Sequence, residues 1–205
     1  LYDAVYGREL QQFIFEKMAA KQTITLKNSE ISLSGDKQLK KYLKDHDDVK
    51  SRVLAAEQSN TSIVYDSNYF LKIYRKLDRA INPDLEINRF LSEKAKFKHI
   101  PDFVGAIEWK YGKETIVLGM MQNMVPNQGD AWVYMLDRLR NYNDRILSHV
   151  DENLSEPKLK GSLTSPVDFD KVPEESQLLI GVTVAERTRV LGIRTGEMHI
   201  ALSSN

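Results

Sequence analysis

One lysine stands within an otherwise apolar and aromatic run, and this feature of the sequence points most directly to chemistry. The run is YFLKIY, residues 69–74, and its charged member is Lys72. Glu86 follows shortly after Asn82 and Pro83. An ammonium group on a sheet needs a counter-charge or access to water. The two residues therefore suggest an ion pair that could hold an anionic group such as a phosphate.

Both residues also have ordinary structural explanations, which the sequence leaves open. A lysine on a half-exposed strand is usually solvated, and a glutamate in the first turn of a helix complements the helix dipole. Because side chains alternate along a strand, Lys72 shares one face with Phe70 and Tyr74. If the opposite face packs on the core, Lys72 projects from the other side of the sheet. Glu86, four residues before Phe90, can then face that sheet.

The first fifty residues are predicted to form a helix, a hairpin and a charged connector. Residues 1–20 have helical periodicity, and TITLK and EISLSG flank an Asn-Ser pair as the strands of a hairpin. Residues 36–50 are charged and mixed in sign, so we expect a solvated connector. The HDD group at residues 46–48 should lie on the surface, because sequence neighbours rarely converge on one metal ion.

From about Arg52 onwards, the pattern predicts three strands, a helix and two further strands. The first three are SRVLAAEQSN, TSIVY and YFLKIYR, and the last two, VGAIEWKY and ETIVLGMMQNM, flank a Gly-Lys turn. Between them, Asn82 is a favourable N-cap and Pro83 suits the first helical position. The helix is predicted to run to about Phe97.

The last eighty residues are predicted to be mainly helical. A helix is expected at about 131–150, a long loop at 151–174 and one long helix at about 175–203. Three glycines in the last helix each weaken it by about 1 kcal/mol relative to alanine, so packing must hold it. Asp130 could cap the first of these helices or contact a ligand, and we favour the cap.

The order of strands and helix from Arg52 onwards is that of a protein-kinase small lobe followed by the start of a large lobe. In kinases, the strand lysine contacts the phosphates of ATP and pairs with a helix glutamate. A glycine-rich loop covers those phosphates, whereas AAEQSNTS, ahead of the lysine strand, has no glycine. Backbone and side-chain groups of this loop could donate to phosphate or simply form a turn. The loop residues in question are Gln58, Ser59, Asn60, Thr61 and Ser62.

Several blocks of the sequence together resemble the maltokinase family, which includes the maltokinase domain often fused behind trehalose synthase. The blocks are EQSNTSIVY, FLKIYRKL, NPDLEINRFL, MVPNQGDAW and LGIRTGEMHIAL, and the opening LYDAVY is also similar. The resemblance runs from end to end of the chain. It depends on the combination of blocks, because no one of them would suffice.

The resemblance implies an α+β fold: a protein-kinase-like small lobe with an N-terminal cap and the first helices of the large lobe. Residues 1–52 would be the cap, residues 53–125 the ATP-binding small lobe, and residues 126–205 the hinge exit and initial large-lobe helices. The reaction implied is phosphoryl transfer from ATP to the anomeric hydroxyl of maltose, which gives maltose 1-phosphate.

The resemblance also implies roles for individual residues. Lys72 would be the ATP-phosphate lysine and Glu86 its helix partner, with residues 58–62 as the phosphate-covering loop. A hinge would read adenine through backbone groups. The implied hinge residues are Gln122, Asn123, Met124 and Val125.

The family's catalytic loop, H-G-D-x-H, does not occur in the sequence. In the family, this loop and an acidic Mg²⁺ motif lie downstream of LGIRTGEMHIAL, so we expect a piece of a longer protein. The intact parent would use ATP and Mg²⁺ and bind maltose. The fragment should be inactive, hold no metal, and bind ATP weakly or not at all. The alternative is a non-catalytic, kinase-like interaction module attached to or docking on trehalose synthase.

Composition excludes several other classes of function. With equal numbers of acidic and basic residues, the chain lacks the charge excess typical of proteins that bind nucleic acid or anionic membranes. No apolar run approaches the roughly 20 residues that span a bilayer. The absence of cysteine excludes thiolate metal sites. We expect a cytoplasmic protein that binds a nucleotide and self-associates through apolar surface left without the rest of a large lobe.

Overall fold

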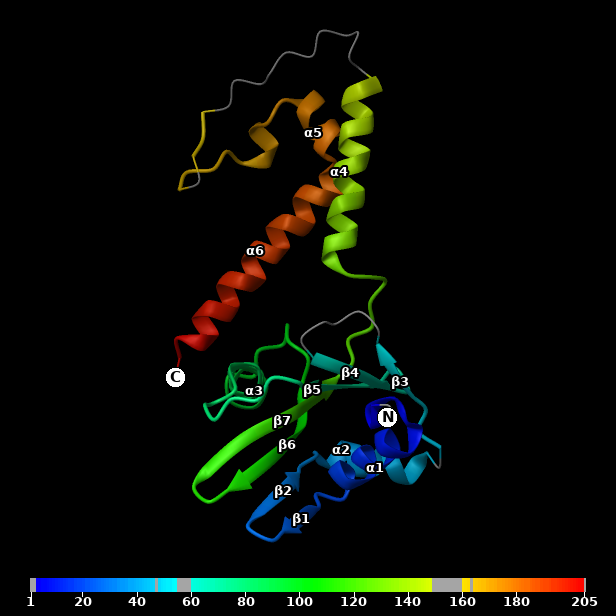
Figure 1. The fold of residues 1–205 in the computed structure, drawn as a ribbon. Coiled ribbons are helices and arrows are strands. Elements are labelled where there is room, and N and C mark those ends of the chain that lie inside the picture. Colours follow the sequence, from blue (N-terminus) through cyan, green and yellow to red (C-terminus); the bar gives the residue numbers. More distant parts are fainter. Residues whose placement is uncertain (1–2, 47, 55–59, 149–159, 163, 205) are drawn as a thin grey trace. The chain divides into compact units, whose positions relative to one another are not determined.

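The computed structural model describes residues 3–46, 48–54, 60–148, 160–162 and 164–204. The chain forms two compact units, Leu1–Pro126 with Ala201–Asn205, and Asn127–Ile200. The first unit contains helices and an antiparallel sheet, so the predicted α+β class is confirmed at that level (Figure 1). The N-terminal fifty residues share this sheet with the strands around Lys72.

The sheet has seven strands, all of them antiparallel to their neighbours. The two predicted hairpins are confirmed as β1 with β2 and β6 with β7. Strand β5, which carries Lys72, is internal and pairs with β4 and β7. In sheet order the strands are β1 (Thr23–Leu26), β2 (Ser29–Leu33), β6 (Phe103–Tyr111), β7 (Glu114–Asn123), β5 (Tyr69–Tyr74), β4 (Asn60–Tyr65) and β3 (Ser51–Leu54).

One face of the sheet is covered by the N-terminal helices. A short 3₁₀ turn, η1 (Ala4–Tyr6), leads into α1 (Arg8–Ala19), and α2 (Lys37–Asp45) follows the first hairpin. These helices pack their buried side chains against alternate residues of β4 and β5 to form the main core. The largest fully buried members include Phe15, Met18, Leu39, Tyr65 and Leu71.

The opposite face of the sheet carries α3 (Pro83–Arg89) and a smaller core. This core contains Leu85 from α3, Ala106 from β6, and Val117 and Met120 from β7. Met120 pairs with Lys72 in the register of β5 and β7. Lys72 and α3 therefore lie on the same side of the sheet.

The prediction of a solvated connector at residues 36–50 is wrong, because α2 occupies most of it. Asp36 caps the helix by accepting a hydrogen bond from the Leu39 N–H at 2.7 Å. Leu39 is fully buried, and Tyr42 and Leu43 pack against the same core. Apolar residues at this spacing form one stripe of a helix, and the surrounding lysines are its solvated face.

The helix after Asn82 begins where the sequence predicts and ends earlier. The Asn82 side chain accepts from the Leu85 N–H, and Pro83 is the first helical residue. The α-helix ends at Arg89 and continues as a π-helical turn, η2 (Phe90–Lys94). Lys96 then adopts a left-handed conformation with φ of 53°, which ends the helix before Phe97.

The second unit is helical, and its last helix is interrupted where one continuous helix is predicted. It contains α4 (Ala131–Ser148), a 3₁₀ turn η4 (Phe169–Lys171) and α5 (Glu174–Ile180), with α6 (Val182–Leu202) continuing from it. Gly181 has φ of 87° and ψ of 123°, a conformation that separates α5 from α6.

The predicted cap of α4 is confirmed, because Asp130 Oδ1 accepts from the Val133 N–H at 2.8 Å. Much of the predicted loop at 151–174 lies outside the described residues. None of the helices in the described part of the chain is long and apolar enough to span a bilayer.

Candidate functional site

Lys72 occupies the middle of the internal strand β5 and points to the face that carries α3. Its register partners are Ser62 on β4 and Met120 on β7, and both are fully buried. The Lys72 side chain is 23% exposed, and its Nζ lies 2.9 Å from Oδ2 of Asp84. The strand therefore presents an ammonium group at the edge of a packed surface, where it is fixed by one carboxylate.

The structure pairs Lys72 with Asp84, whereas the sequence prediction names Glu86 as its partner. The physical reason is helical geometry, since residues two positions apart lie about 200° apart around an α-helix. The buried residues of α3 are Leu85 and Asn88. These residues mark the face of α3 that lies toward the sheet, and Asp84 borders that face one turn before Asn88. Glu86, which is expected from the sequence to face the sheet, is exposed.

Tyr74 is a third member of the site that the sequence prediction does not include. Its hydroxyl donates a hydrogen bond to Asp84 Oδ2 at 3.0 Å, so the same carboxylate oxygen accepts from Lys72 and from Tyr74. Burial raises the pKa of the Tyr74 phenol, and the nearby Asp84 carboxylate raises it further. The signal in the sequence is its spacing, because Tyr74 is two residues after Lys72 and shares its strand face.

The predicted phosphate-covering loop is only partly described. Gln58 and Ser59 lie outside the described residues, and Asn60, Thr61 and Ser62 belong to β4. Their placement in a loop is therefore wrong. The Thr61 hydroxyl accepts from Arg75 Nε at 2.9 Å, and both Thr61 and Ser62 are buried. Burial follows because β4 is paired on both sides, with β3 and with β5.

The predicted adenine hinge begins inside strand β7. Gln122 and Asn123 are the last residues of that strand, and Met124 and Val125 follow it. The Asn123 N–H donates to the Asp102 carbonyl at 2.9 Å, and the Met124 N–H donates to the Asn68 carbonyl at 2.7 Å. A purine that used either N–H would first have to replace one of these bonds.

Helix α3 and the turn η2 are anchored to the chain that enters β6. Asn88 Nδ2 donates to the Pro101 carbonyl at 3.2 Å, and Ser92 Oγ accepts from the Phe103 N–H at 2.9 Å. The Asp102 carbonyl, which lies between these two contacts in sequence, is the one that binds Asn123. These contacts connect α3, the helix that carries Asp84, to Asn123 of the predicted hinge.

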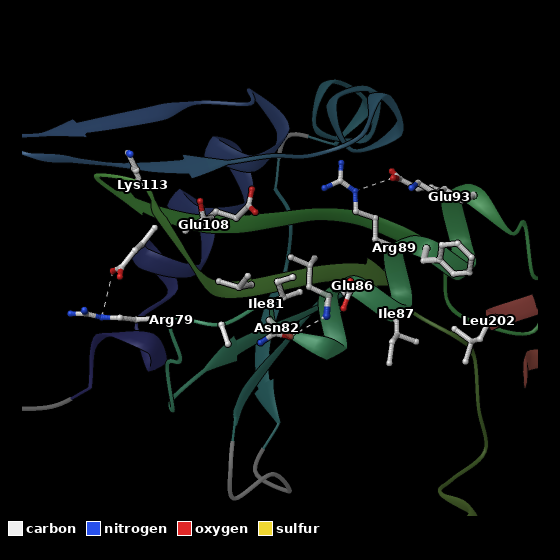
Figure 2. A pocket seen from close by; sticks show the side chains of 17 residues that line it. Arg79, Ile81, Asn82, Glu86, Ile87, Arg89, Glu93, Glu108, Lys113 and Leu202 are labelled. Atoms are coloured by element: carbon white, nitrogen blue, oxygen red, sulfur yellow. Dashed lines mark hydrogen bonds and ion pairs between the residues drawn. The ribbon is translucent and has the colours of Figure 1, made fainter. Parts of the chain in front are cut away.

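Glu86 lines a pocket between α3 and the hairpin of β6 and β7. Its walls come from residues 79–82, α3, η2, the hairpin of β6 and β7, and Leu202, and neither Lys72 nor Asp84 is among the residues that line it (Figure 2). Two ion pairs lie at its rim, Arg79 with Glu114 at 3.6 Å and Arg89 with Glu93 at 3.0 Å. The pocket and the Lys72 site are therefore different places.

No model of a known protein family matches this sequence. Within the described residues, no group of three or more histidine, aspartate or glutamate side chains is arranged to hold a metal ion. The candidate site therefore consists of Lys72, Asp84 and Tyr74, which β5 and α3 bring together.

Proposed function

We propose that this chain is the nucleotide-binding part of an ATP-dependent sugar phosphotransferase of the maltokinase kind. The observation that carries the proposal is the ion pair between Lys72 on an internal strand and Asp84 on the next helix. A strand lysine that pairs with a carboxylate of the following helix is the arrangement with which kinases contact ATP phosphates. The α+β fold and the order of elements, from three strands through one helix to two strands, agree with that assignment.

The chemical role of Lys72 in this proposal is to bind and orient phosphate oxygens. An ammonium group has three N–H donors, and the bond to Asp84 uses one of them. Asp84 neutralises the lysine in the absence of nucleotide and fixes its direction. Phosphoryl transfer depends mostly on positioning and charge stabilisation, so a fixed cation beside the phosphates lowers the barrier.

The complete reaction would need a longer polypeptide with the H-G-D-x-H loop that the resemblance implies. The bond between the γ-phosphorus and the β–γ bridging oxygen would break, and a bond from that phosphorus to the anomeric oxygen of maltose would form. The products would be ADP and maltose 1-phosphate, and the hydroxyl proton would pass to a base of that loop. Mg²⁺ bound with the nucleotide would neutralise charge on the phosphates.

One observation favours the rival function, a kinase-like interaction module that docks on trehalose synthase. The N–H groups of Asn123 and Met124 already donate to protein carbonyls. Neither N–H can donate to adenine unless its present hydrogen bond breaks. Under the rival function, the Lys72–Asp84 pair is structural and nucleotides do not bind.

The two functions are separated by the coding sequence beyond Asn205 and by the activity of its product. The kinase proposal expects H-G-D-x-H there and ATP-dependent formation of maltose 1-phosphate. Lys72→Ala should then lower the rate by about 100-fold or more, the size of effect seen when one preorganised charge-stabilising donor is removed. An active enzyme whose rate and ATP dependence survive Lys72→Ala would contradict the assignment of Lys72.

A further inference from the structure

Asp84 Oδ2 receives two donors from one strand, and the second donor has no role in the proposed function as stated above. Lys72 Nζ lies 2.9 Å from this oxygen and the Tyr74 hydroxyl lies 3.0 Å from it. We propose that Tyr74 is a positioning residue that holds the Asp84 carboxylate against Lys72. The inference rests on the proposed function, because its consequence is tighter binding of nucleotide phosphates.

The Tyr74 ring is held by its own packing, so the hydroxyl is placed before any ligand arrives. The ring packs against the small core formed by Leu85, Ala106, Val117 and Met120. Tyr74 and Lys72 are two residues apart on β5 and share a face. The strand therefore brings a neutral donor and a cation to the same carboxylate in a fixed geometry.

The Asp84 side chain needs such a second contact because it is 41% exposed. A half-exposed carboxylate with one partner can rotate toward water, and exposed ion pairs contribute little for this reason. The hydroxyl of Tyr74 restricts that rotation without adding charge. Asp84 then keeps the Lys72 ammonium aligned, and the remaining N–H donors of Lys72 stay directed at the phosphate position.

The test is a double-mutant cycle on ATP affinity with Tyr74→Phe, Asp84→Asn and the double variant. Phenylalanine keeps the ring in the small core, and thermal unfolding checks that each variant is folded. Titration with ATP is followed by NMR, which measures weak dissociation constants. We expect Tyr74→Phe to weaken ATP binding roughly two- to tenfold, less than the full worth of a hydrogen bond to a charged group, because the hydroxyl acts on ATP only through Asp84. We expect no further weakening by Tyr74→Phe when Asp84 is already asparagine. Tyr111→Phe, at a ring that is 51% exposed, is the matched control.

Each of the other possible outcomes contradicts the positioning role of Tyr74, alone or together with the proposed function. If Tyr74→Phe weakens ATP binding equally with and without the Asp84 carboxylate, the Tyr74 hydroxyl acts independently of Asp84 and the positioning role is wrong. If Lys72→Ala weakens ATP binding but Tyr74→Phe binds as tightly as the unmodified protein, the inference fails and the proposed function stands. If the unmodified protein does not bind ATP, both fail together.

Discussion

At the scale of single residues, the structure assigns the ion pair of Lys72 to the first acidic residue of NPDLE rather than to the second. Asp84 stands at the second position of α3 and contacts Lys72, whereas Glu86 lines a pocket that neither Lys72 nor Asp84 lines. The sequence contains both carboxylates within three positions, so spacing alone does not distinguish them. The distinguishing signal is burial of Leu85 and Asn88, which fixes the rotation of the helix about its axis.

The burial of Tyr65 predicts that the folded protein loses stability at high pH. Tyr65 is fully buried, donates to the Gln11 carbonyl at 2.8 Å, and has its pKa raised by burial. Above about pH 10 the unfolded chain loses this phenol proton while the folded protein keeps it. The unfolded state then binds fewer protons, so the free energy of unfolding falls as pH rises.

The measurement is urea unfolding of the unmodified protein and Tyr65→Phe from about pH 9 to 11. Each tyrosine of this kind contributes a slope of up to about 1.4 kcal/mol per pH unit. Tyr65→Phe should reduce the decline by that contribution, although it costs about 1 kcal/mol at neutral pH through the lost hydrogen bond. The control is Tyr6→Phe, at a ring that is 61% exposed. An unchanged decline in Tyr65→Phe would show that Tyr65 does not carry the effect.

At the scale of elements, α2 shows that tertiary packing can stabilise a helix in a segment whose composition predicts a solvated connector. The segment is dominated by charged residues, which led to the prediction of a connector, yet its few apolar residues fall on one face of a helix. Leu39 is its fully buried member. Helical stability in such a segment comes from burying that face rather than from its average polarity.

Leu39→Ala tests this packing directly. Removing a fully buried leucine side chain costs about 2–5 kcal/mol, because transfer energy is lost and a cavity remains. Leu77→Ala is the matched control, since Leu77 is 44% exposed and surface changes are usually within about 0.5 kcal/mol. Chemical unfolding of the two variants should separate them clearly. Equal stability of the two would mean that α2 does not pack against the sheet.

The elements also show what the sequence could and could not predict. Alternating apolar residues and turn pairs located the hairpins, and Asn82 with Pro83 located the start of α3, because these signals are local. The break at Gly181, the π-helical turn and the faces of the helices were missed or misplaced, because they depend on contacts between distant segments. The strand position of Lys72 and the face that it shares with Tyr74 could be predicted because they are local, whereas the contact of both residues with Asp84 could not.

At the scale of the whole molecule, the N-terminal helices and the strands around Lys72 form one compact unit with a shared core. The sheet has α1 and α2 on one face and α3 on the other, and the Lys72 site lies on the α3 face. In the proposed function, the face that carries α1 and α2 stabilises the sheet, and the face that carries α3 binds the nucleotide.

The most direct test of this account is whether ATP reaches Lys72. The protein would be labelled with ¹³C at the lysine ε-carbons, and ATP titrated while the NMR signals of Lys72 and of exposed Lys76 are followed. The account predicts a saturable shift of the Lys72 signal with a dissociation constant of about 1 mM or tighter, an affinity of about 4 kcal/mol. The shift at Lys76 should be smaller, and Lys72→Ala should remove most of the binding. Saturable binding of ATP that leaves the Lys72 signal unmoved, or no binding at all, would contradict the account.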